Sequence, residues 1–155
     1  YQSNPDYLVG ALASSVPESN RVAALCSIHS LKLNPAQAVC LNISNGLTSK
    51  SDLIRHALNM KPSYMVLGDD AANAESIGYI SASGHQPYIA SIYASGIDQA
   101  NQILGSHDST QTDIFVLQES NSSGEPHVSA IYERQDGDYK EVFGLSEDGA
   151  LEASV

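Results

Sequence analysis

The sequence is poor in basic residues. Its 155 residues hold seven Lys and Arg against 18 Asp and Glu, which gives a formal net charge of -11 at pH 7. Negative charge of this size repels phosphate backbones and anionic lipid, so it argues against nucleic acid and membrane surfaces as main partners. A polyphosphate ligand would need strong local donors to bind against this field.

Long hydrophobic runs are also missing, and cysteine is scarce. No run approaches the ~20 apolar residues that cross a bilayer, so we expect no membrane insertion and a cytoplasmic location. Cys26 and Cys40 each lie in an apolar, strand-like run, and we interpret them as small buried hydrophobes in a reducing compartment. The histidines show no paired spacing with cysteines or carboxylates that would indicate a metal site.

What is present suits a globular α/β domain. Hydrophobic residues make up 42% of the chain and charged residues 16%, so we expect a single domain over residues 1–155. The stretch from Asp52 to Leu104 reads as helix, proline stop, apolar strand, Gly-Asp-Asp, helix, Ser-Gly-His, strand and helix. This order is typical of the back half of a nucleotide-binding α/β domain with an acidic pair at the carboxyl end of a strand.

Hydrophobic periodicity predicts the individual elements. We expect helices over 6–14, 53–60, 71–82 and 97–104, and strands over 21–28, 37–43, 64–67 and 87–92. Ser49 begins a capping box for the second of these helices. After Gly105 we expect strands over 113–118, 128–134 and 139–143, joined by hairpins into an antiparallel β-meander over 106–143. We interpret the acidic C-terminal stretch as a solvated, frayed tail.

The pair Asp69-Asp70 is the clearest candidate for chemistry. Two carboxylates at a strand end can bind Mg²⁺. The alternative is a plain strand-to-helix turn, in which Asp70 is the N-cap of the helix that follows. The residues alone leave both interpretations open.

Several segments resemble the secretion and pilus traffic ATPases of the type II and type IV systems, above all the branch that powers tight-adherence (Flp-type) pili. The segment 53–62 resembles the family's Arg-Pro helix, and 83–85 (Ser-Gly-His) its first His box. The segment 8–13 resembles the helix behind the P-loop, and 113–116 a strand of the closing β-region. The resemblance implies a RecA-like P-loop NTPase core, a three-layer domain with a mostly parallel sheet, followed by the antiparallel meander.

The departures from the family pattern fall on the residues that handle phosphate. A P-loop needs glycines, a lysine and a Ser or Thr, but these positions hold Asn4, Pro5 and Asp6. Pro5 offers neither an ammonium group nor an N–H, and Asp6 adds a negative charge where phosphate would lie. Without a P-loop strand, two strands in the middle of the sheet would face an open slot. We expect this slot to be closed by rearrangement, by a partner or a second copy, or by residues outside this chain.

The resemblance assigns the remaining site positions. Asp69 takes the place of the Walker B glutamate and His85 that of the first His box, while Arg55 becomes a basic residue that acts beside nucleotide at a subunit boundary. The family's other acids, its Walker B arginine and its second His box are replaced by Cys26, Ser27, Ala71 and Tyr93. Because phosphoryl transfer depends on positioning and charge, these joint losses indicate a degenerate domain that does not hydrolyse ATP.

Three hypotheses therefore remain open. The first is a pseudo-ATPase without a cofactor, which assembles as a homo- or hetero-oligomer with proteins of a secretion or pilus machine, an active motor ATPase among them. The second is an active motor that uses ATP and Mg²⁺ and whose P-loop lies outside this chain. The third is a protein-binding module on the same scaffold with an unrelated function.

Overall fold

The chain folds into two compact units. The structure, a computed structural model, describes residues 5–27, 31–33, 38–43, 48–84, 87–105, 112–146 and 150–154. One unit comprises 5–93 with 100–110 and is called the parallel-sheet unit; the other comprises 1–4, 94–99 and 111–155 and is called the antiparallel-sheet unit. Helix α4 (Ile97–Gly105) contributes residues to both. The single domain over 1–155 stays a prediction.

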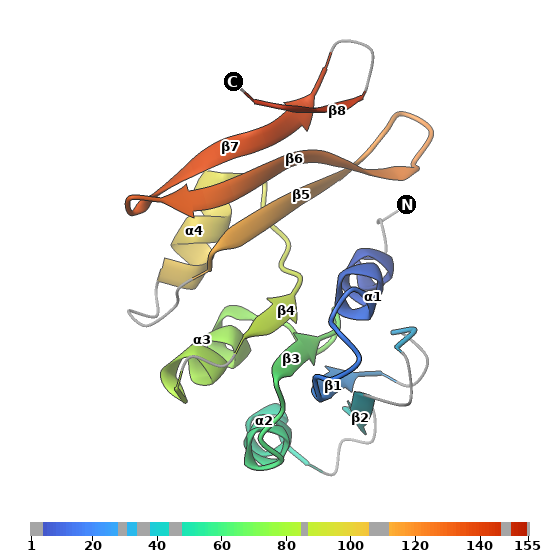
Figure 1. The fold of residues 1–155 in the computed structure, drawn as a ribbon, viewed down its shortest axis with the longest axis vertical. Coiled ribbons are helices and arrows are strands. Elements are labelled where there is room, and N and C mark those ends of the chain that lie inside the picture. Colours follow the sequence, from blue (N-terminus) through green and yellow to red (C-terminus); the bar gives the residue numbers. More distant parts are fainter. Residues whose placement is uncertain are drawn as a thin grey trace. The chain divides into compact units, whose positions relative to one another are not determined.

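Four short strands form the sheet of the parallel-sheet unit. They are β1 (Val22–Cys26), β2 (Ala38–Asn42), β3 (Tyr64–Leu67) and β4 (Tyr88–Ala90), at the places that the apolar runs predicted. Their order is β2-β1-β3-β4, and every pair is parallel (Figure 1). Within the described part of the chain these strands adjoin one another directly, so the slot is closed as predicted, and the described strands close it by their own pairing.

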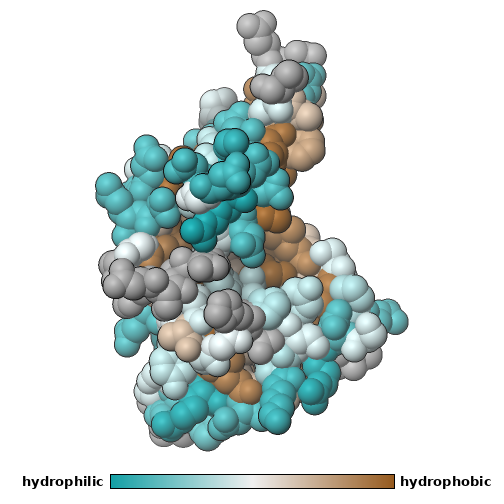
Figure 2. Space-filling model, turned by 60° about the vertical axis from the view of Figure 1, so that its left-hand side comes forward, coloured by the Kyte–Doolittle hydropathy of each residue, from teal (hydrophilic) through white to brown (hydrophobic). Residues whose placement is uncertain are grey.

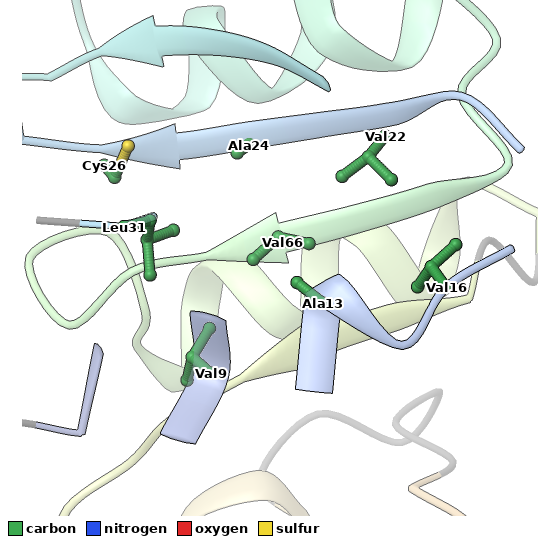
Figure 3. Close-up of a cluster of buried hydrophobic side chains, with 8 residues drawn as sticks. All are labelled: Val9, Ala13, Val16, Val22, Ala24, Cys26, Leu31 and Val66. Atoms are coloured by element: carbon green, nitrogen blue, oxygen red, sulfur yellow. The ribbon is translucent and has the colours of Figure 1, made fainter. Parts of the chain in front are cut away.

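Helices cover both faces of this sheet. α1 (Asp6–Ser14) lies on one face, and α2 (Lys50–Asn59) and α3 (Ala74–Ala82) lie on the other (Figure 1). Side chains alternate along a strand, so Val22, Ala24 and Cys26 point toward the α1 side, where Val9 and Ala13 meet them (Figure 3). Leu25, Met65 and Leu67 point the other way and are completely buried, as is Ile54 of α2. This alternation produces a three-layer α/β core.

Side-chain caps begin two of the helices. Ser49 is the N-cap of α2, as predicted, and its hydroxyl accepts the Asp52 amide at 3.1 Å. The Asp52 carboxylate reaches back to the Ser49 hydroxyl, which donates to it at 2.7 Å. The N-cap of α3 is Asn73, whose Oδ1 accepts the Ser76 amide at 2.7 Å. Asp70 was the N-cap in one of the two interpretations left open, and that part of the interpretation was wrong.

A turn explains this later start of α3. The amides of Ala71 and Ala72 both donate to the Gly68 carbonyl at 2.9 Å, so the chain reverses before the helix begins. The sequence pattern did not separate this turn from a first helical turn because Ala71 and Ala72 are good helix formers.

The antiparallel-sheet unit contains a four-stranded meander. Its strands are β5 (Ile114–Ser120), β6 (Pro126–Gln135), β7 (Asp138–Leu145) and β8 (Leu151–Ala153), in the order β5-β6-β7-β8. The three predicted strands are there, joined by the predicted turns; Asp136 and Gly137 have φ of 56° and 98° in the β6–β7 hairpin. The C-terminal stretch is no frayed tail, since β7 and β8 pair there with exposed acidic side chains.

Two smaller expectations concern burial. Cys26 is buried as predicted, but Cys40 is exposed, because β2 is at the end of the strand order and pairs with β1 alone among the described strands. Cys26 and Cys40 form no disulfide, although β1 and β2 are neighbours. None of the helices in the described ranges is long and apolar enough to cross a bilayer.

Candidate functional site

The candidate site lies where β1 and β3 end, on the sheet edge where open α/β sheets bind ligands. These strands are parallel neighbours with Leu25 opposite Leu67, so the residues that follow each strand lie side by side. The Gly68 amide donates to the Leu25 carbonyl at 2.9 Å. A Cβ at Gly68 would lie 3.0 Å from the Cys26 Cβ and 3.3 Å from the Asp6 Oδ1, so glycine is needed for this close approach.

Asp6 brings the amino end of α1 to this edge. It is in the first turn of the helix, directly after Pro5, and is only 5% exposed. Its Oδ1 accepts a hydrogen bond from the Asp69 amide at 2.8 Å. Helix amino ends carry partial positive charge and bind anions. Here the chain supplies the anion itself, in the form of the Asp6 carboxylate.

Tyr93, which follows β4 in the chain, holds the side chain of Asp69. The Tyr93 hydroxyl donates to the Asp69 Oδ2 at 3.1 Å. Tyr93 is 58% exposed, and the partial burial of its hydroxyl raises its pKa. The hydrogen bond to Asp69 and the negative charges of Asp69, Asp6 and Asp70 raise it further. The neutral phenol is therefore the stable form, and it occupies one oxygen of the carboxylate that the resemblance placed at Walker B.

Asp70 is held separately from Asp69. The Ser27 hydroxyl donates to the Asp70 carboxylate, and the Lys50 ammonium donates to the Asp70 backbone carbonyl. These contacts tie the ends of β1 and β3 to the amino end of α2. Asp70 is exposed, so they join surface groups and form no enclosed charge pair.

Arg55 is the next predicted site residue, and its described contacts lie on its own helix. Arg55 is on the exposed side of α2 and pairs with Asp52 of the same helix at 2.5 Å. Its action at a subunit boundary stays a prediction. Asn4 and His85 lie outside the described residues. Of the six predicted nucleotide-binding residues, the structure therefore brings Asp6 and Asp69 together, with Pro5 beside them at the start of α1.

The described residues do not fit a bound triphosphate with its Mg²⁺. The amide of Asp69 and the amino end of α1 are the natural donors for phosphate at this place, and the Asp6 carboxylate already accepts the amide. A second anion there would meet that buried charge. Among the residues described, no group of three His, Cys, Asp or Glu could hold a metal ion. Metal binding by Asp69 and Asp70 stays a prediction.

Some residues of this site were identified from the sequence, but the contacts that they make were not. Ser27 and Tyr93 were interpreted only as substitutes for lost family residues, yet they hold the two aspartates. Lys50 was not singled out. No local pattern could have shown these pairs, because Ser27 and Asp70 are 43 residues apart and Asp6 and Asp69 are 63 apart.

The class of protein is mixed α/β: a three-layer core with a parallel sheet is followed by a separate antiparallel sheet. Two solved ATPases are similar in fold over most of this chain. One is the VirB11 ATPase of the Brucella suis type IV secretion system in complex with sulphate, at a TM-score of 0.64 and 20% identity over 83% of this chain. The other is the Legionella pneumophila ATPase DotB, at a TM-score of 0.58 and 14% identity over 83% of this chain.

These similarities establish the fold and leave the activity open. The matched regions are 44% of the VirB11 chain and 41% of the DotB chain, so this chain corresponds to less than half of either protein. No protein-family profile matches the sequence. No curated protein matches it either.

Proposed function

We propose that this chain is a RecA-like pseudo-ATPase domain, related to the secretion and pilus ATPases, that serves the assembly or regulation of such a machine without hydrolysing ATP. The tight-adherence pilus branch is the proposed relative, and the cytoplasm, at the inner face of the membrane, is the proposed location. The proposed partners are proteins of the machine, an active motor ATPase among them, in a homo- or hetero-oligomer.

The buried carboxylate of Asp6 carries this proposal. It occupies the amino end of α1 and accepts the Asp69 amide at 2.8 Å, where an active site of this type would need an unoccupied donor and a nearby cation. The residue before it is Pro5, which has neither an N–H nor a positive charge. The partner of Asp69 is Tyr93, a neutral hydrogen-bond donor.

The shared fold supports the secretion part of the proposal. Fold alone does not establish function, but the VirB11 ATPase of a type IV secretion system matches over 83% of this chain. The segments quoted from the sequence, above all 53–62, resemble the same group of proteins. A scaffold retained without its phosphate cradle is suited to protein assembly.

Nucleotide binding tests the proposal directly. We expect calorimetry with ATP and Mg²⁺ to show no binding to this chain, and we expect no rise in its melting temperature. A ligand present at 100 times its Kd would stabilise the folded state by about 2.7 kcal/mol, which is readily detected. The same measurement on a chain extended at its amino end examines the hypothesis of an active motor; turnover by that longer chain would refute the pseudo-ATPase.

Asp6→Asn is the matched variant. The amide retains an oxygen that can accept the Asp69 N–H but removes the negative charge. If the charge of Asp6 is what excludes phosphate, sulphate and ATP should bind this variant more tightly than the unmodified chain. Equal, measurable binding to both chains would show that Asp6 does not exclude anions. Size measurement alone and with a secretion motor subunit then tests the assembly role.

A further inference from the structure

The antiparallel sheet has one apolar face with little cover. Residues that pair across antiparallel strands share a face, as do residues two apart on one strand. The register places Val116 opposite Ile131, Ile131 opposite Phe143, and Leu145 opposite Leu151. Together with Ile114, these six side chains define the apolar face: Ile114, Val116, Ile131, Phe143, Leu145 and Leu151.

Four of these side chains are substantially exposed. The exposed fraction is 57% for Ile114, 40% for Phe143, 40% for Leu145 and 42% for Leu151. Ala130 is the one buried residue in β5–β8. Figure 2 shows brown, hydrophobic surface beside teal surface in the upper part of the view. A sheet normally buries one face against another layer, whereas these four apolar side chains stay exposed.

The opposite face of the sheet is better covered by its own aromatic groups. Phe115 pairs with Tyr132 across β5 and β6, and the Phe115 and Tyr139 rings make an edge contact with centroids 4.8 Å apart. Their side chains are half-buried. The exposure is therefore a property of the apolar face, and it does not extend to the whole sheet.

Charge indicates what kind of molecule fits this face. Residues 111–155 contain ten Asp and Glu against two basic residues, Arg134 and Lys140. A second copy of this chain would carry the same excess of negative charge, and so would anionic lipid or nucleic acid. A positively charged protein segment would be attracted by the negative charge of this unit. If apolar side chains alternated along that segment, they would cover the exposed apolar face.

We infer that the apolar face of β5–β8 is a docking surface for a basic, amphipathic segment of a partner protein. Phe143 and Leu151 lie on its central and distal strands and supply the apolar contact, while the surrounding carboxylates attract the Lys and Arg of the partner. The docking surface does not depend on whether the chain binds nucleotide, because none of its residues belongs to the candidate site at β1 and β3.

Synthetic peptides of about ten residues, the length of a long strand, test the inference. One peptide alternates Lys with Val, a second alternates Glu with Val, and a third alternates Ser with Val. We expect the Lys peptide alone to bind the full chain in fluorescence anisotropy, with an affinity that falls as NaCl is raised. Equal binding of all three peptides, or no binding of the Lys peptide, would overturn the proposal.

Paired variants locate the binding surface. The double variant Phe143→Ser with Leu151→Ser should weaken the Lys peptide about tenfold or more. The matched control, Met60→Ser with Tyr79→Ser, removes two side chains that are each 43% exposed on the other unit, and should leave the affinity unchanged. An equal loss in both variants contradicts a specific site.

A measurement on the unmodified chain guards against loss of folding in the variants. In NMR spectra, the Lys peptide should shift the amide resonances of β5–β8, above all those beside Phe143 and Leu151, and leave α2 and α3 unshifted. Shifts confined to the helices, or spread evenly over all acidic residues, would place the peptide elsewhere and reject the docking surface.

Discussion

Gly68 is the residue with the least room in the candidate site. Its amide bonds to β1, and a Cβ there would meet Cys26 at 3.0 Å and Asp6 at 3.3 Å. We expect Gly68→Ala to lower the free energy of unfolding by about 1–3 kcal/mol, the usual range for overpacking. Urea unfolding measures the change.

Gly105 provides the control for this prediction. A Cβ at Gly105, at the end of α4, would meet nothing within 4 Å. Gly105→Ala should therefore leave stability unchanged or raise it slightly, because alanine favours the helix. If Gly68→Ala proved as stable as the unmodified chain, the close approach of β1, β3 and α1 would be wrong.

The second prediction for a single residue concerns Tyr93 and the pH dependence of folding stability. Its pKa in the folded chain is raised, first by burial and then by Asp69. As pH rises past about 10, the unfolded tyrosine loses its proton before the folded one, so the folded state loses stability over that window. Below it, Tyr93 is neutral in both states and adds no pH dependence.

Replacing Asp69 isolates the contribution of its carboxylate. In Asp69→Asn, the pKa of Tyr93 should fall part of the way toward its ordinary value, because burial still acts on the phenol. An NMR titration of the Tyr93 ring in both chains measures this shift. Identical titration curves would show that the hydroxyl and the carboxylate do not interact in solution.

At the scale of elements, the start of α3 depends on Asn73. Its side chain accepts the Ser76 amide at 2.7 Å, and α3 places Ile77 and Ile80 in the core. Asn73→Ala should cost about 1 kcal/mol of stability, because an N-terminal amide of the helix loses its partner. Thermal unfolding measures the loss.

Asn73→Ser is the matched control for the cap. Serine can accept the same hydrogen bond, so its stability should stay close to that of the unmodified chain. Asp70→Ala addresses the alternative start, since Asp70 is exposed and does not cap α3 in the structure. Because Asp70 also accepts from Ser27, Ser27→Ala is measured beside it. A loss from Asp70→Ala that exceeds those from both Ser27→Ala and Asn73→Ala would restore the earlier start predicted from the sequence.

At the scale of the whole molecule, net charge governs the response to salt. The chain carries a formal charge of -11, and the one ion pair between described side chains, Arg55 with Asp52, is exposed. Screening should weaken the general repulsion more than it weakens that pair. We expect the urea midpoint to rise between low salt and about 1 M NaCl, where the Debye length is about 3 Å.

A second salt is the control for the effect of NaCl on the urea midpoint. Substituting KCl for NaCl at the same ionic strength should give the same rise, because screening depends on ionic strength and not on the cation. A midpoint that falls with salt would mean that attractive pairs dominate the charge balance, against the composition of the chain.

Local patterns were sufficient to predict most of the elements. The apolar runs at β1, β3 and β4, the helix cap at Ser49 and the turn at 136–138 all depend on neighbours within a few residues, and the structure confirms them. The burial of Cys40 was predicted wrongly. Central strands and end strands can have the same apolar sequence pattern, so the pattern does not show how exposed a strand is. The strand order places β2 at the end of the sheet.

The sequence by itself determined the alternation of strands and helices and the acidic character of the chain. It also placed Asp6 and Asp69 at the positions where the family that the chain resembles has its P-loop and Walker B residues. Only the tertiary structure decided that Asp6 binds the Asp69 amide and that Tyr93 holds the Asp69 carboxylate. The physical reason is that parallel pairing and the packing of α1 bring residues 63 positions apart into contact. Such contacts depend on non-local packing, and no short-range sequence pattern records it.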